Sequence, residues 1–396
     1  MPRGCANWNE TDSYIGGLPM LGEHPWPRTT AGVPLTFCAQ IDLEAVTAMR
    51  SDTGLPQTGL LLFFCDTVQN QHGSVVYLGT AGSLRQPPAR TLHAFGEYYG
   101  RSLLNHDNPL RAAHTLPRWP VEFHPAPYEE AVDGDGIDPL ELEAANPEFC
   151  RPRLVDILIK HKLAPDAALR ETGFVWHASV KILAGHLMRE LSACRETLLE
   201  QILPDTGKSR ARRAWIKHTP LRWTKGYKPF RKFVLDLWAW AQEQPAWAEL
   251  NDEDRKRLWQ STERLDEEFR RFAPETRSLY SVGLGGAENL ARDTVKHAAT
   301  GSDEAWLALP EPLREHVNNH ELAPGDDPER HQMFGQGRIV QAGVYERLNQ
   351  LLLLQLTYDS FGSLWPGDVG IMTWWISAEH LKTREWTQTE FMFECH

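Results

Sequence analysis

Short apolar runs bounded by turn residues lie near both ends of the chain. Residues 35–41, 59–64 and 75–78 form three such runs in the first hundred residues, and a Pro-Gln-Thr-Gly turn leads into the second. Residues 351–356 and 370–376 form two more near the other end. Continuous apolar runs of this length between turn signals are typical of buried strands. The pattern therefore predicts strand-rich structure at both ends, whereas the proline-interrupted residues 85–146 are expected to form a surface connection.

From about residue 150 the apolar residues follow a helical spacing instead. The first apolar face, at steps of three and four, predicts a long amphipathic helix that Pro204 ends. A second helix should begin near Pro229, because proline is tolerated in the first turn of a helix. A third should follow Asn251, a good N-cap before three acidic residues. The three predicted faces are Val180, Leu183, Leu187, Leu191, Cys194, Leu198 and Ile202; Phe233, Leu237 and Trp240; and Leu258, Leu265, Phe269 and Phe272.

The two strand-rich ends resemble each other. Each has a strand that contains a glutamine, Gln40 or Gln355, then a turn with proline, a glycine, and a strand that closes on paired aromatic residues. Two related half-units would explain this similarity. A chance resemblance between two apolar hairpins is the alternative, because such strands share composition.

Length, composition and charge limit the classes of protein to consider. A chain of 396 residues, 41% of them hydrophobic, can bury a large core and suits one domain with an insertion, or two domains. The net charge of −12 favours solubility and disfavours bulk attraction to DNA or anionic lipid. No apolar run reaches the length of a membrane-spanning helix, and the N-terminus lacks the apolar region of a secretory signal. We therefore expect a soluble, cytoplasmic protein without a membrane partner.

Motifs that would indicate catalysis or a cofactor are incomplete. The segment 207–209, Gly-Lys-Ser, resembles the end of a phosphate-binding loop, but Ile202 stands where the motif requires glycine. The acidic segment 133–138 resembles a calcium loop, yet Ala131 and Leu142 occupy the ligand positions. His316 and His320 have helical spacing but no obvious third ligand. The six cysteines form no C-x-x-C pair, so we expect reduced, mostly buried thiols. No catalytic residue, cofactor or metal is predicted.

Three stretches of the sequence carry a resemblance to a known family. They are Gly16 to Pro19 with Trp26-Pro27 and residues 34–41 and 59–66; His331 to Gly335 with Gln341; and residues 353–356, 367–376 and 391–395. Their order and spacing resemble the YwqG-like family of bacterial proteins, also called domain of unknown function 1963. Pro366 precedes Gly367-Asp368 where the family usually has tryptophan, and the middle of the chain is longer than in typical members.

The resemblance implies an α+β fold and no established enzymatic residues. The predicted organisation is a strand-rich YwqG-like body, residues 1–148 plus 326–396, with a mainly helical insertion at 149–325. Members of the family often lie in bacterial toxin–immunity neighbourhoods, so the resemblance also implies, by analogy, an immunity role.

One segment of the middle region has an unusual charge pattern. Residues 208–232 contain ten lysines or arginines and no acidic residue, with aromatic residues between them. Such a pattern could bind single-stranded nucleic acid or an acidic protein surface, or form a solvated face neutralised elsewhere in the fold. The candidate partner-binding residues are Arg212, Arg213, Arg222, Trp223, Lys225, Tyr227 and Lys228.

Together these observations favour a binding protein over an enzyme. The leading hypothesis is a cytoplasmic immunity protein that binds and neutralises a cognate bacterial toxin, with much of its specificity in the insertion. One alternative is a nucleic-acid-associated protein that uses residues 208–232, although the acidic balance of the chain makes nucleic acid a less favoured partner. Another is an undescribed hydrolase. The sequence does not specify the toxin or the oligomeric state.

Overall fold

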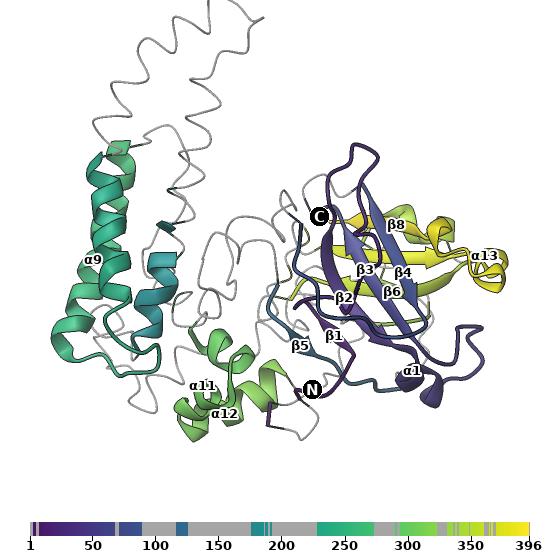
Figure 1. Ribbon diagram of the computed structural model, residues 1–396, viewed down its shortest axis with the longest axis horizontal. Coiled ribbons are helices and arrows are strands. Elements are labelled where there is room, and N and C mark those ends of the chain that lie inside the picture. The colour runs from purple at the N-terminus through teal and green to yellow at the C-terminus, as the bar shows by residue number, and fades with distance from the viewer. Residues whose placement is uncertain are drawn as a thin grey trace, which may run out of the picture. The chain divides into compact units, whose positions relative to one another are not determined.

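The computed structural model describes residues 3–4, 8–67, 71–88, 116–125, 176–185, 187–188, 191, 228–272, 290, 294–322, 331–335, 337–338, 340–347, 349–359, 364, 366 and 370–395. Helices and antiparallel sheets are both present, so the predicted α+β class is confirmed (Figure 1). The chain divides into two compact units. Unit 1 comprises residues 1–101, 113–151 and 314–396, and unit 2 comprises residues 102–112 and 152–313. The predicted domain boundaries, at residues 149 and 325, stay a prediction.

The first sheet of unit 1 is built from the N-terminal part of the chain. Its five antiparallel strands have the order β4-β3-β2-β1-β5. The predicted strands near residues 35–41, 59–64 and 75–78 are confirmed as β2, β3 and β4. The strands are β1 (Tyr14–Ile15), β2 (Thr36–Asp42), β3 (Leu60–Cys65), β4 (Gly73–Leu78) and β5 (Trp119–Pro120), and helix α1 (Leu43–Met49) joins β2 to β3.

Strand β5 corrects one expectation. It lies within residues 85–146, which the proline content suggested were only a surface connection, yet it pairs with β1 and its Trp119 is buried. Proline is compatible with this position because β5 is an edge strand and need not donate on its outer side. A two-residue strand of this kind is determined by its partner, which no local pattern reveals.

The second sheet of unit 1 is built from the C-terminal part. Its antiparallel strands have the order β6-β7-β8, and the two predicted runs are confirmed as β6 and β7. The elements are the 3₁₀ helix η4 (Ala342–Arg347), β6 (Leu351–Thr357), β7 (Ile371–Ile376), helix α13 (Ala378–Thr383), the 3₁₀ helix η5 (Trp386–Gln388) and β8 (Glu390–Glu394).

The two sheets pack against each other, as Figure 1 shows. The Trp374 indole nitrogen of β7 donates to the Phe64 carbonyl of β3 at 3.3 Å, and the Phe63 and Trp374 rings are 5.4 Å apart. Every residue of β3 and of β7 is buried. Strands covered on both faces need apolar residues on both, which explains why these segments are continuous apolar runs rather than alternating ones.

The two halves of unit 1 have the same strand order, direction and register. In the first half Gln40 pairs with Leu62, and in the second Gln355 pairs with Thr373. Both central pairs have their irregularity at the same place, between Phe37 and Ala39 and between Leu352 and Leu354, two residues before each glutamine. A bulge at the same register position is a specific shared feature, because each bulge reverses the faces of the residues beyond it. The structure supports the repeat over a chance resemblance.

The glutamines and glycines of the two halves also have matching contacts. The Gln40 side-chain oxygen accepts from the Met20 backbone N–H at 2.9 Å, and that of Gln355 accepts from the Arg338 N–H at 2.7 Å. A Cβ atom at Gly59 would lie 2.5 Å from the Leu78 carbonyl, and one at the equivalent Gly370 would lie 2.5 Å from the Glu394 carbonyl. Both positions therefore require glycine for the same steric reason.

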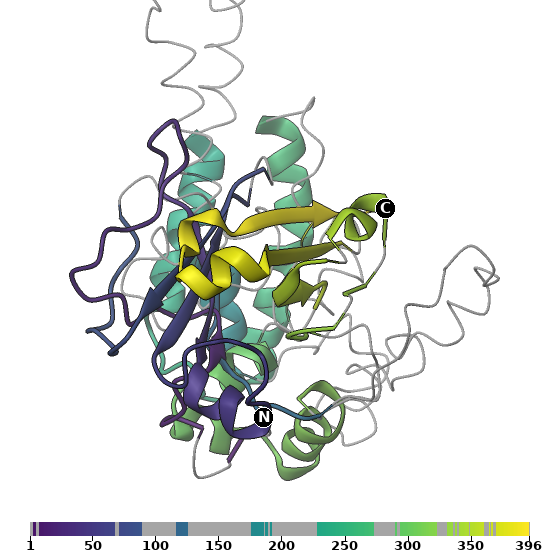
Figure 2. The same ribbon diagram turned by 90° about the vertical axis from the view of Figure 1, so that its right-hand side faces the viewer.

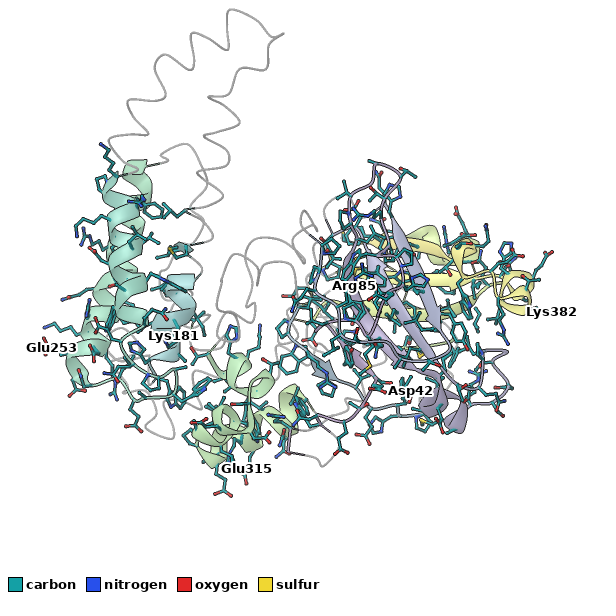
Figure 3. All side chains as sticks on the ribbon, viewed as in Figure 1. Asp42, Arg85, Lys181, Glu253, Glu315 and Lys382 are labelled. Atoms are coloured by element: carbon teal, nitrogen blue, oxygen red, sulfur yellow. The ribbon has the colours of Figure 1, made fainter. Side chains whose placement is uncertain are left out.

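The helices that the structure describes in the two halves lie in different connections. In the first half α1 connects β2 to β3, whereas in the second half α13 connects β7 to β8. Helix α13 nevertheless lies beside the loop that follows α1 (Figure 2). Arg384, which follows α13, donates a hydrogen bond to the Gly54 carbonyl of that loop at 2.7 Å. Asp42, labelled in Figure 3, accepts from the Glu44 N–H at 3.0 Å and so caps α1.

Unit 2 is helical in its described residues. Helical residues occur at 178–185, 187–188, 191, 228–241 and 294–300, together with α9 (Asp252–Phe272) and α11 (Asp303–Ala308). Helix α12 (Glu311–His316) spans the boundary between the units, and the π-helix η3 (Val317–Glu321) follows it in unit 1. The predicted N-cap is confirmed, since Asn251 accepts from the Asp254 N–H at 2.8 Å.

The apolar faces predicted for these helices form the core of unit 2. Its largest cluster contains Val180, Leu183, Leu187, Leu191, Phe233, Leu237, Trp240 and Leu258, all from the predicted faces. The remaining predicted residues, Cys194, Leu198, Ile202 and the side chains of Leu265, Phe269 and Phe272, lie outside the described residues.

Candidate binding surface

The basic segment chosen from the sequence lies almost wholly outside the described residues. Lys228 is exposed at the start of helix 228–241. The other candidates lie outside the described residues, so the structure does not place them together or apart: Arg212, Arg213, Arg222, Trp223, Lys225 and Tyr227.

The weaker motifs have a similar outcome. Segments 133–138 and 207–209 lie outside the described residues, as does the His320 side chain, whereas His316 is buried in α12. Within the described part of the chain, no three His, Cys, Asp or Glu side chains form a group that could hold a metal ion.

A different site is formed by residues 331–335, which we call the edge segment. It runs antiparallel beside β6, where Gln332 and Gln355 exchange backbone hydrogen bonds of 3.1 and 2.8 Å and the Phe334 N–H donates to the Leu352 carbonyl at 2.8 Å. In the repeat it occupies the place of β1, whose Tyr14 pairs with Gln40. The edge segment is thus held by a strand that belongs to the core.

A histidine and a carboxylate pair lie at one end of the edge segment. The Thr357 N–H donates to His331 Nδ1 at 3.2 Å, which assigns the proton of a neutral ring to Nε2. That Nε2 lies 3.6 Å from Asp359 Oδ2, and the two side chains are 24% and 38% exposed. This arrangement orients a polar group that solvent or a bound molecule can reach.

A strained aromatic residue lies at the other end. Phe334 has φ +65°, a left-handed conformation that side chains rarely adopt. Its repeat counterpart is Gly16, with φ +69°, and the next residues, Gly17 and Gly335, match at +69° and +73°. The second half therefore has a large side chain where the first half has none.

The Phe334 ring contacts the region after α1. The Arg50 guanidinium lies 5.4 Å from the centre of this ring, within the range of a cation–π interaction. The Arg50 Nε also donates to Asp52 at 2.9 Å, and this hydrogen bond lowers the pKa of the Asp52 carboxyl. Met49, the last residue of α1, has 49% of its surface exposed. We call Met49, Arg50 and Phe334 the Phe334 patch.

Sequence reasoning identified these residues only in part. The stretch His331 to Gly335 carried the family resemblance, but nothing marked it as a site. The available signal was the repeat, since aligning the halves places Phe334-Gly335 on Gly16-Gly17 and so shows a bulky residue in a glycine position.

Comparison with protein families decides the relationship. The family model described as a domain of unknown function, DUF1963, matches residues 13–88 and 236–395, more than half of the chain. The chain belongs to the DUF1963 family. No curated protein matches it.

The matched segments clarify which parts of the chain are family structure. Both halves of the repeat, the edge segment and the Phe334 patch lie within the DUF1963 match. The second matched segment begins at residue 236, so it includes residues 236–325, which the sequence analysis had assigned to the insertion. None of the described helices is long and apolar enough to cross a membrane.

Proposed function

We propose that this protein is a cytoplasmic immunity protein that binds and neutralises a cognate bacterial toxin, and that the Phe334 patch forms part of the contact. The observation that carries the proposal is the strained Phe334, a large aromatic residue in a left-handed conformation at a partly exposed position. The implied association of the family with toxin–immunity neighbourhoods supports the choice of partner.

The strain argues for a role of the side chain. A left-handed conformation costs a residue with a Cβ atom about 1–2 kcal/mol, and glycine at the same position would avoid that cost. Strained residues of this kind cluster at binding and catalytic sites. Gly16 shows that the same backbone geometry forms in this fold without a side chain.

The composition of the patch fits a protein interface. Phenylalanine, methionine and arginine are enriched in interface cores, and arginine is frequent at hot spots. Met49 presents apolar surface, and Arg50 is 56% exposed in its side chain while it covers the Phe334 ring. Met49 ends α1, Arg50 follows it directly and Phe334 lies beside β6, so the fold holds these side chains in place before a partner binds.

The repeat supplies the test of this role. In the Phe334→Gly variant we expect unit 1 to keep its stability or gain some, because the strain is removed, while affinity for the proposed cognate toxin falls at least tenfold. Affinity is measured by calorimetry on the full chain, and stability by thermal unfolding. Co-expression with the toxin should show a matching loss of growth protection.

A matched control separates the patch from exposed apolar surface in general. Leu84, 60% exposed after β4, is outside the patch, so Leu84→Ala should leave affinity unchanged. Unchanged affinity and full protection in Phe334→Gly would remove the patch from the interface. No binding by the parent protein would refute the immunity role itself.

A further inference from the structure

Three sulfur atoms meet in the interior of unit 1. The Cys38 and Cys65 sulfurs, on neighbouring strands β2 and β3, are 3.3 Å apart. The Cys65 sulfur is also 3.7 Å from the thioether sulfur of Met372 on β7. All three residues have no exposed surface, and both cysteines are free thiols. Residues more than 300 positions apart thus bring two thiols and a thioether together between the sheets.

The repeat shows that packing alone does not require these sulfurs. In the matching register, Leu353 occupies the position of Cys38, Ile376 that of Cys65, and Leu61 that of Met372. All three counterparts are fully buried aliphatic residues. Sulfur-containing and aliphatic side chains therefore fill equivalent positions between the sheets equally well. The three sulfur atoms are a chemical difference that packing does not explain.

We propose that Cys38, Cys65 and Met372 form a binding site for one monovalent soft metal ion, with Cu(I) as the ion that the ligands fit best. Thiolate and thioether ligands together select Cu(I), whereas zinc sites usually have four ligands drawn from thiolate, imidazole and carboxylate. On binding, the ion bonds to the sulfurs and the two thiol protons leave to solvent. Neither copper nor sulfur changes oxidation state.

The surroundings of the cluster suit a soft ion. Burial, the neighbouring Cys38 thiol and the Asp66 carboxylate raise the pKa of Cys65 well above its ordinary value, so without metal the Cys65 thiol keeps its proton and is unreactive. A bound cation reverses this preference, because a thiol that coordinates a metal gives up its proton. The buried position also shields the ion from water and from small oxidants.

The experiment uses the full chain with Cys5, Cys150, Cys194 and Cys395 changed to serine, so that only Cys38 and Cys65 remain. Cu(I) is supplied anaerobically as its complex with a chromophoric chelator, and its transfer is read from the loss of that chromophore. We expect one equivalent to bind, and X-ray absorption to show three sulfur ligands. Changing Cys38 or Cys65 to alanine should weaken binding at least 100-fold.

The third ligand has a matched control. Met372→Leu introduces the residue of its repeat counterpart and should lower the Cu(I) affinity about tenfold, whereas Met392→Leu in β8 should not change it. Thermal unfolding without metal checks that each variant folds. The proposal fails if the four-serine chain takes no copper from the chelator, or if Met372→Leu binds as tightly as its parent. It also fails if the folded chain still takes up copper as well as its parent after both cysteines are changed to alanine.

Discussion

Gln40 and Gln355 show how a single buried polar residue organises each half of unit 1. Both side chains are fully buried, and each accepts from the backbone of the segment that covers the outer face of its sheet. Gln40 also donates to the Asp12 carbonyl at 2.9 Å. A buried amide with its hydrogen bonds satisfied fixes one position of a covering loop, which apolar contacts alone would leave less defined.

Replacing such a glutamine should be costly. Gln40→Leu leaves the Met20 N–H and the Asp12 carbonyl without this partner, so we expect the free energy of unfolding to fall by about 1–3 kcal/mol. Urea-induced unfolding followed by tryptophan fluorescence measures the change. The exposed Gln57→Leu should shift it by less than about 0.5 kcal/mol. Equal effects of the two changes would contradict the role of Gln40.

Single residues could be predicted from the sequence where both halves share them, and could not be predicted where the two halves differ. The glutamines could be found because both stand in apolar runs of similar composition. Phe334 could not be found from its own neighbours, because its conformation is imposed by pairing with β6, a long-range contact. The sulfur cluster was missed for a similar reason, since Met372 meets Cys65 only when the sheets pack.

Among the elements, the long ones were predictable and the short ones were not. Strand β3 and helix α9 have continuous patterns and clear start signals. Helix α13 has only six residues, too few for a recognisable period, although Ser377 caps it by accepting from the His380 N–H at 3.2 Å. Strand β5 has two residues and exists because β1 lies beside it.

The C-terminal end of helix 228–241 gives a prediction about pH. His177 Nε2 lies 3.2 Å from the Trp240 carbonyl, and Lys181, labelled in Figure 3, donates to the Ala241 carbonyl at 2.6 Å. Both side chains thus contact backbone carbonyls of the last helical turn, which have no hydrogen-bond partner within the helix. Burial, and secondly the Lys181 charge, lower the pKa of His177 below its ordinary 6.5.

The sign of the effect follows from this lowered pKa. Above pH 6.5 His177 is neutral in both the folded and the unfolded chain, and its contribution to the free energy of unfolding is fully present. As the pH falls below 6.5, the unfolded chain binds the proton first, so stability drops until the pH is below the folded pKa. We expect His177→Gln, which keeps a donor, to reduce this loss of melting temperature, whereas the exposed His24→Gln should not. An unchanged pH profile in His177→Gln would contradict this assignment.

For the whole molecule, the repeat of two half-units could be predicted from the sequence, but the connections in which their helices lie could not. The two glutamine hairpins suggested related half-units, and their shared register and bulge support that interpretation. No pattern in the sequence indicated that the described helices α1 and α13 would lie in different connections of the two halves. A helix between strands depends on loop length and on packing with the other half, neither of which a local pattern contains.

Charge distribution leads to a second whole-molecule prediction. Residues 208–232 are strongly basic, but the chain has a net charge of −12, so the remaining surface should repel a phosphate backbone. We expect no appreciable binding of a generic single-stranded oligonucleotide by fluorescence anisotropy, even at low salt. Micromolar, salt-sensitive binding that reversing Arg212, Arg213 and Lys225 to glutamate abolishes would favour the nucleic-acid alternative instead.

Hydrogen–deuterium exchange of the full chain, with and without the proposed cognate toxin, tests the proposed interface most directly. If the Phe334 patch binds the toxin, amides of residues 43–52 and 331–335 should exchange more slowly in the complex, because binding excludes water and restrains both segments. The Phe334→Gly variant should lose this protection. Protection confined to other segments, such as 208–232, or no protection anywhere, would contradict the account.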